Sequence, residues 1–190
     1  MSRVAVVYHS GYGHTKVLAE AVARGAGGVG GTKVVLVPVE NALDRIEELN
    51  AADAIVFGSP TYMGSASAAF KTFMEATSKL WMAQAWKDKI AAGFVNSASQ
   101  NGDKQVVFQQ LMTFALQHSM IWVGLGLMPG NNSSTGSVDD LNRLGVFSGA
   151  AAQSNADQGP DAVTQSDRKT AEYLGKRVAE TVRKFALVAA

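Results

Sequence analysis

The stretch that decides the fold is Val4 to Lys16, which reads VAVVYHSGYGHTK. A valine-rich apolar run, typical of a strand, leads into a loop of glycine and hydroxyl residues, and a helical pattern follows at once. Such a loop offers backbone N–H groups, two hydroxyls and the positive end of a helix dipole, which together favour an anionic phosphate. The spacing Ser10-x-x-Gly13-x-Thr15 therefore predicts a phosphate-binding loop. A tight strand-to-helix turn capped by Ser10 or Thr15 is the structural alternative.

Two common phosphate-binding motifs do not fit this loop. The nucleoside-triphosphate pattern G-x-x-x-x-G-K-[ST] is absent from the sequence. The dinucleotide pattern G-x-G-x-x-G fails because Lys16 stands where the third glycine is needed. The loop therefore indicates a different phosphate-bearing ligand, whose identity must come from other loops.

Composition excludes several classes of protein. The 190 residues are 47% hydrophobic and 17% charged, which predicts a single globular domain over residues 1–190. The net charge of +1 gives no reason to expect nucleic acid as a partner. Cysteine is absent, so disulfides, thiolate metal sites and cysteine nucleophiles are excluded, and no metal site is expected. No secretion leader or membrane-length apolar stretch is evident, so a cytoplasmic location is expected.

Short apolar runs alternate with helical patterns along the chain. The strand-like segments are Arg3 to Tyr8, Lys33 to Val37, Ala54 to Gly58, Ile90 to Asn96 and Met120 to Gly126. The helical stretches begin near Thr15, Ala42, Ala66, Asp103 and Thr164. This alternation predicts an α/β fold in which helices cover both faces of a five-stranded parallel sheet.

One segment departs from the alternation. Residues 127–163 are rich in Gly, Ser, Asn and Asp and show little periodicity. A connection this long inside a compact domain is usually functional or disordered. Its centre, Leu141 to Phe147, is apolar enough to dock on the rest of the molecule, and a solvated insertion is equally compatible with the composition.

Three loops follow strands that would end at the same edge of the sheet, where open parallel sheets bind ligands. They are Ser10 to Thr15, Ser59 to Ser65 and Asn96 to Gly102. Together they hold amides, hydroxyls, aromatic rings and a thioether, with no carboxylate and no catalytic dyad. This set suits a planar heteroaromatic group held by hydrogen bonds and does not suit hydrolysis.

These loops resemble the phosphate, dimethylbenzene and pyrimidine loops of the flavodoxin-like FMN proteins. Within that group the chain most resembles the WrbA-type NAD(P)H:quinone oxidoreductases. The motifs that carry the resemblance are YHSGYGH at 8–14, GSPTYMG at 58–64, TFMEAT at 72–77, HSM at 118–120 and AEYLG at 171–175. The resemblance implies a doubly wound sheet with strand order 2-1-3-4-5.

The resemblance also implies which residues hold FMN and its partners. The cofactor-binding residues implied are Ser10, Gly11, Tyr12, Gly13, His14, Thr15, Pro60, Thr61, Tyr62, Met63, Gly64, Asn96, Ser97, Ala98, Ser99, Gln100, Asn101, Gly102 and His118. Tyr12 matches a nicotinamide-side contact, and Trp81 and His118 match substrate-side positions. Core packing is the alternative for Trp81, and a lone surface histidine is the alternative for His118.

The reaction implied is two-electron transfer from NAD(P)H through FMN to a quinone, with the chemistry on the cofactor. A flavodoxin-type one-electron carrier and an NAD(P)H-dependent FMN reductase are the alternatives. A receiver domain is disfavoured because His9-Ser10 and Gly58-Ser59 stand where its acidic residues would be. The helix containing Val106 to Leu116 is apolar on more than one side, which favours a homodimer or homotetramer, with deep burial as the alternative.

Overall fold

The computed structural model describes residues 1–188, with side chains described up to residue 186. The strands are β1 (Ser2–Tyr8), β2 (Thr32–Pro38), β3 (Ala54–Tyr62), β4 (Ser65–Ala66), β5 (Ile90–Ser97), β6 (Ile121–Trp122) and β7 (Ala150–Gln153). The helices are α1 (His14–Gly27), η1 (Val39–Asn41), α2 (Ile46–Asn50), α3 (Ala68–Ala76), α4 (Ser78–Met82), α5 (Lys104–Gln117), η2 (Pro160–Ala162) and α6 (Gln165–Val188). None of the described helices is long and apolar enough to cross a membrane.

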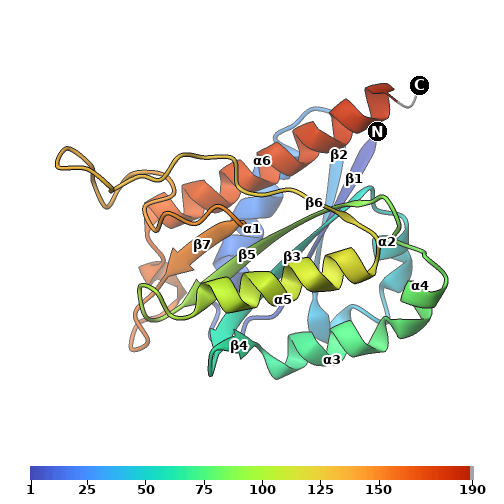
Figure 1. Ribbon diagram of the computed structural model, residues 1–190, viewed down its shortest axis with the longest axis horizontal. Coiled ribbons are helices and arrows are strands. Elements are labelled where there is room, and N and C mark those ends of the chain that lie inside the picture. The colour runs from blue at the N-terminus through green and yellow to red at the C-terminus, as the bar shows by residue number, and fades with distance from the viewer. Residues whose placement is uncertain (189–190) are drawn as a thin grey trace.

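The strands form one sheet in the order β2-β1-β3-β5-β6, and β4 and β7 pair with β3 and β5. Along this path the pairing is parallel, so that Val6 lies between Leu36 of β2 and Val56 of β3. The path confirms the predicted order 2-1-3-4-5. It brings the carboxyl ends of β1, β3 and β5 to one edge of the sheet (Figure 1).

The predicted fifth strand is divided into two short strands. β6 contains only Ile121 and Trp122 and pairs with the first residues of β5. β7, which the sequence did not predict, pairs with Phe94 and the residues after it. The chain leaves the sheet after β6 because Leu125 donates its N–H to the carbonyl of Phe147 instead of to β5, at 2.9 Å. The predicted strand from Met120 to Gly126 was therefore too long.

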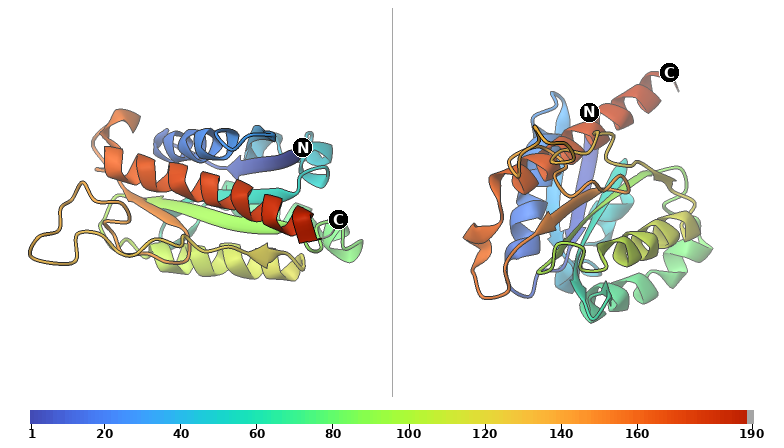
Figure 2. Two further views of the ribbon diagram at one scale, coloured as in Figure 1. Left: turned by 90° about the horizontal axis from the view of Figure 1, so that it is seen from above. Right: turned by 60° about the vertical axis from the view of Figure 1, so that its left-hand side comes forward.

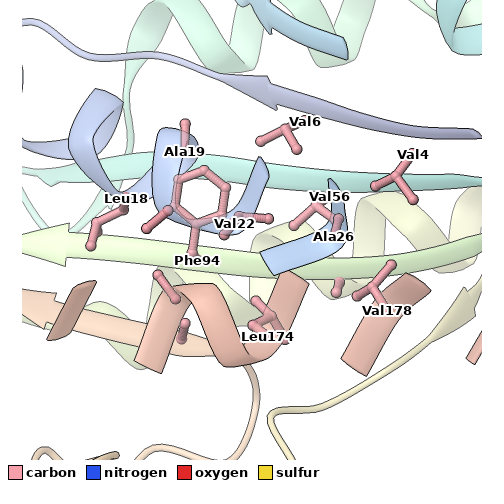
Figure 3. Packing of buried hydrophobic residues seen from close by; sticks show 14 of the residues in the cluster. Val4, Val6, Leu18, Ala19, Val22, Ala26, Val56, Phe94, Leu174 and Val178 are labelled. Carbon is pink, nitrogen blue, oxygen red and sulfur yellow. The ribbon is translucent and has the colours of Figure 1, made fainter. Parts of the chain in front are cut away.

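Successive side chains of each strand point to opposite faces of the sheet, and the apolar ones form one hydrophobic core on each face. Val4, Val6 and Phe94 face the layer of α1 and α6, and their packing is shown in Figure 3. Val7 and Phe57 face the opposite layer, which contains α3 and α5. Figure 2 shows the sheet between these two helical layers, as expected for strands that are apolar on both faces.

The predicted helix starts agree with the structure except near Ala42. That region forms the short η1, a series of turns, and α2, which begins at Ile46. In α6 the apolar side chains of Ala171, Leu174 and Val178 are buried, whereas the side chain of Phe185 is half exposed.

The long connection docks on α6. The backbone N–H of Asn142 donates to Thr170 Oγ1 at 2.9 Å, and Asn142 Oδ1 accepts from the N–H of Val146. Arg143 makes two hydrogen bonds with the carboxylate of Asp167, at 2.8 and 2.7 Å. The part of the segment that precedes residue 141 extends as the long gold loop of Figure 1. Of the two alternatives for residues 141–147, docking is therefore the one observed.

Candidate functional site

A cavity of about 350 Å³ lies at the carboxyl ends of β1, β3 and β5. It is lined by Ser10, Gly11, Tyr12, His14, Thr15, Pro60, Thr61, Tyr62, Asn96, Ser97, Ala98, Ser154 and Ala156. All three loops predicted from the sequence contribute to it, because their strands run parallel and end at the same edge. A fourth segment, which follows β7, closes one side.

The first loop turns sharply into α1 at Gly13, whose φ is 88°. A Cβ there would lie 2.4 Å from Pro160 Cγ, so both conformation and space require glycine. Ser10 Oγ accepts the N–H of Lys16 at 3.1 Å. Within the described chain, the N–H groups of His14 and Thr15 at the start of α1 have no acceptor and are available to a ligand.

The second loop continues β3 into a short hairpin with β4. Thr61 pairs with Ala66, and the turn between them places Met63 and Gly64 at positive φ. Met63 is fully exposed there and does not line the cavity. Thr61 Oγ1 is buried in the cavity wall and has no hydrogen-bond partner among the described residues.

Hydrogen bonds with Ser154 and Lys104 hold the third loop. Asn96 Nδ2 donates to Ser154 Oγ at 2.9 Å, while Asn96 Oδ1 is buried and lacks a partner in the part of the chain described. Lys104 Nζ donates to Ser97 Oγ at 2.6 Å. The remaining residues of this loop, Ser99 to Gly102, do not line the cavity.

The wall of the cavity contains no aspartate, glutamate, lysine or arginine. Just before the first loop, Glu40 lies 2.6 Å from His9 Nδ1, and its side chain is about half exposed. At the mouth, Tyr12 is 76% exposed and meets the ring of Tyr62 edge to face. Burial raises the pKa of Tyr62, so its hydroxyl stays protonated at neutral pH.

His118 and Trp81 lie elsewhere in this chain. Both line a larger groove of about 650 Å³, bounded by α3, α4 and α5. This groove is larger than the cavity at the ends of β1, β3 and β5. The loops predicted to bind FMN line the smaller cavity, which is therefore the candidate site. His118 is 2% exposed and lies against Trp86, with ring centroids 4.5 Å apart. It is not a surface histidine.

The protonation state of His118 follows from its contacts. The Thr77 hydroxyl donates to the carbonyl of Met74 at 2.7 Å, so its oxygen accepts the Nε2–H of His118 at 2.9 Å. Nδ1 is then unprotonated and has no partner among the residues described. Desolvation lowers the pKa of His118 to about 4, so the ring is neutral at pH 7.

The cavity contains some of the residues predicted to bind FMN and lacks others. Eleven predicted residues line the cavity, whereas Gly13, Met63, Gly64, Ser99, Gln100, Asn101, Gly102 and His118 do not. Ser154 and Ala156 line it and were not predicted. They follow β7, whose alanine-rich sequence is typical of a helix, so no strand signal pointed to the loop after it.

The wall fits FMN in three respects. Unpaired N–H groups at the start of α1 suit its phosphate, as at other helix N-termini. The orphaned Thr61 Oγ1 and Asn96 Oδ1 can form hydrogen bonds with the donors and acceptors of its ring system. The tyrosine rings at the mouth suit a planar aromatic group. No cluster of side chains suited to a metal ion occurs among the described residues.

The chain is similar to a known protein family and to several known proteins. Residues 9–132 match the model of the NADPH-dependent FMN reductases. The chain is 45% identical to flavodoxin FldP of Pseudomonas aeruginosa, over 94% of this chain and 96% of that one. It is 32% identical to an NAD(P)H dehydrogenase (quinone) of Archaeoglobus fulgidus, over 97% and 100% of the two chains.

Among solved structures, the chain resembles a flavodoxin, WrbA-like protein from Agrobacterium tumefaciens. The two share 40% identity with a TM-score of 0.76, and the match covers 97% of this chain and 99% of the other. Because the family model matches more than half of the chain and the relatives match nearly all of it, the chain belongs to the NADPH-dependent FMN reductase family, as a flavodoxin-like oxidoreductase.

Proposed function

We propose that this protein is an FMN-dependent NAD(P)H:quinone oxidoreductase. The observation that carries the proposal is the uncharged cavity with two orphaned polar atoms, Thr61 Oγ1 and Asn96 Oδ1, beside an exposed tyrosine. Similarity to proteins named NAD(P)H dehydrogenase (quinone) supports the choice of donor and acceptor.

Different residues of the cavity would bind different parts of FMN. The N–H groups of His14 and Thr15 would hold the phosphate, while Thr61 and Asn96 would bind the ring system. When bound, FMN supplies a centre that accepts hydride from a nicotinamide and passes two electrons to a quinone. Tyr12, exposed at the mouth, would stack against a planar substrate. Nicotinamide and quinone would use this one opening in turn, which predicts ping-pong kinetics.

The absence of carboxylates from the wall bears on the reaction. A carboxylate about 4 Å from an anionic ring would add roughly 4 kcal/mol of repulsion at an effective dielectric of 20. The described wall contains none, so fully reduced, anionic FMN is accessible. Accessible two-electron reduction is what a quinone reductase requires.

A one-electron carrier is the second candidate, because the relative at 45% identity is named a flavodoxin. A third, the NAD(P)H-dependent FMN reductase of the family description, would release FMN as a product. The three differ in measurable ways. A carrier reduces benzoquinone slowly with NAD(P)H, and an FMN reductase loses its FMN on gel filtration after reduction.

The deciding experiment combines binding with turnover. Purified protein is titrated with FMN and followed by visible absorption, and NADH or NADPH oxidation is then measured with and without benzoquinone. We expect saturable binding and quinone-dependent oxidation faster than that with free FMN. Protein that binds no FMN, or oxidation no faster than with free FMN, would contradict the proposal.

Two variants test the assigned wall. Thr61→Val removes one hydrogen-bonding atom, so FMN affinity should fall by roughly 3–10-fold, which is the value of one such bond. Asn96→Leu removes Oδ1 and also the Nδ2 donor to Ser154, so its loss of affinity should be at least as large. Thr72→Val is the matched control, since Thr72 lies on the exposed side of α3 and bonds only the carbonyl of Ala68. An equal loss of affinity in the control would exclude a specific role for Thr61.

Self-association is also proposed. Val106 and Leu116 on α5 and Trp81 on α4 are exposed apolar side chains along the larger groove or beside it. Light scattering coupled to gel filtration measures the mass directly, and a monomer at micromolar concentration would contradict this part of the proposal.

A further inference from the structure

One buried cation lies behind the third loop of the cavity. Lys104 is the first residue of α5, yet its side chain is only 2% exposed, because it turns back beneath the loop. Lysine is rarely buried unless it is paired with an acid. In the described chain no carboxylate lies within 4 Å of its ammonium group. The charge is therefore held by neutral groups alone.

The ammonium group has a full set of acceptors. Its three protons meet Ser97 Oγ at 2.6 Å, the carbonyl of Ser99 at 3.0 Å and the carbonyl of Gln100 at 2.7 Å. Ser97 Oγ uses its own proton to bond Ser99 at 2.8 Å, so it can only accept from the lysine. A neutral amine has one donor fewer, so the arrangement is complete when Lys104 is charged.

The loop is built around this group. Gly102 has a φ of 53°, and a Cβ there would lie 2.1 Å from Ser97 Oγ, so the loop can fold over the lysine with glycine at that position. Because trans peptide groups point their N–H opposite to their C=O, the N–H groups of Gln100 and Asn101 face away from the ammonium. Lys104 thus sets the orientation of the third loop.

The charge lies one side chain away from the cavity. Ser97 lines the cavity, and its hydroxyl is in direct contact with Lys104 Nζ. The charged groups nearest on other elements are Asp167 of α6 and Arg143 of the long connection, which are paired with each other, and Asp103 precedes it in the chain. Burial lowers the pKa of Lys104 to about 8, an effect that Asp167 opposes and Arg143 reinforces.

We propose that Lys104 is a positioning residue that favours reduced, anionic FMN over oxidised FMN in the adjoining cavity. The inference rests on the proposed binding of FMN and deepens it. Reduction adds two electrons and one proton to FMN, and the product carries one more negative charge than the oxidised form. A buried cation one hydrogen-bonded side chain away stabilises that added charge.

A change in the midpoint potential of bound FMN distinguishes this role from a purely structural one. In Lys104→Met, the ratio of affinities for reduced and oxidised FMN should fall roughly tenfold, which lowers the two-electron midpoint potential by about 30 mV. Lys104→Arg should retain part of the wild-type value. Lys89→Met is the matched control, because Lys89 is a partly buried lysine that also donates to backbone carbonyls but lies at the other end of the strands. Its potential should equal that of the wild type.

The wild-type protein provides a second test that needs no variant. Below about pH 8 Lys104 is charged in both redox forms, so reduction takes up one proton for two electrons. Above about pH 8, and up to the higher pKa that the added negative charge gives Lys104 in the reduced form, the neutral amine also takes up a proton on reduction. The midpoint potential should then fall by about 60 mV for each pH unit instead of about 30 mV.

Spectroelectrochemistry with redox mediators measures both quantities, and visible absorption reports FMN binding separately. An unchanged potential in Lys104→Met, an equal shift in Lys89→Met, or no change of slope in the wild type would overturn the inference while leaving FMN binding intact. Failure of the wild type to bind FMN would overturn both the inference and the proposed function.

Discussion

At the scale of single residues, Gly13 shows how the first loop depends on one position. Its positive φ allows the chain to leave β1 and enter α1 within a few residues, and Pro160 occupies the space where a side chain would be. The loop is therefore shaped jointly by the segment next to it and by one that is distant in sequence.

We expect Gly13→Ala to lower the free energy of unfolding by about 1–3 kcal/mol, because it combines an unfavourable backbone conformation with a clash. FMN affinity should fall as well, since the N–H groups of His14 and Thr15 would move. Gly30→Ala is the control, because a Cβ at Gly30 meets nothing within 4 Å. Chemical denaturation and FMN titration measure the two effects, and equal stability of both variants would contradict the expectation.

The buried His118 predicts a dependence of stability on pH. Its folded pKa of about 4 lies below the unfolded value near 6.5, so the unfolded state binds the proton more readily. Stability is fully present above pH 6.5 and is lost as the pH falls toward 4. The loss amounts to about 3 kcal/mol, at 1.36 kcal/mol for each unit of pKa difference.

His118→Phe isolates this contribution, because phenylalanine fits the aromatic cluster with Trp86 and Phe114 and does not titrate. Urea denaturation of both proteins at pH 7 and pH 4.5 gives the difference. If the wild type and the variant lose the same free energy between these pH values, His118 is not the titrating group.

At the scale of elements, the packing of α1 against α6 depends on two glycines. A Cβ at Gly25 would lie 1.8 Å from the carbonyl oxygen of Glu172, and one at Gly175 would lie 1.9 Å from that of Val22. The two backbones approach closely there, and the layer beside the first loop is consequently fixed.

We expect Gly175→Ala to destabilise the protein by about 3 kcal/mol, because the helices must separate to admit the methyl group. Gly27→Ala, in the same helix pair, should be neutral or stabilising by up to about 1 kcal/mol, since its Cβ meets only Val34 at an ordinary distance of 3.8 Å. Thermal unfolding of the two variants compares them. Two destabilisations of equal size would argue against close backbone contact.

At the scale of the whole molecule, the long connection is joined to the site through α6. Asp167 accepts two hydrogen bonds from Arg143 and one from the N–H of Gln153 at the end of β7. Ser154, which holds Asn96 in the cavity wall, is the next residue. A buried ion pair outside the cavity thus positions the segment that closes it.

Arg143→Met should destabilise the protein by about 3–5 kcal/mol, because the nearly inaccessible Asp167 carboxylate would be left unpaired. The double variant Arg143→Met with Asp167→Asn should recover much of that loss. Denaturant unfolding of the single and double variants completes a double-mutant cycle. Additive losses would show that the pair does not act as a unit.

Prediction from the sequence succeeded where a local pattern carried the information. The valine run before Ser10 and the glycines after it identified both β1 and the loop that follows. Prediction was wrong where contacts with residues distant in the chain determine the local structure. Nothing local marks Ala150–Gln153 as a strand, because alanine favours helices and only the free edge of β5 gives that segment its partner.

The sequence by itself determined the alternation of strands and helices and the three neutral loops that follow the strands. These depend on periodicity and turn chemistry, which act over a few residues. The tertiary structure alone decided that Ser154 completes the cavity, that His118 lies beneath Trp86 and that Lys104 lies behind the third loop. Such placements depend on which distant segments fill the same space, and no spacing along the chain encodes that.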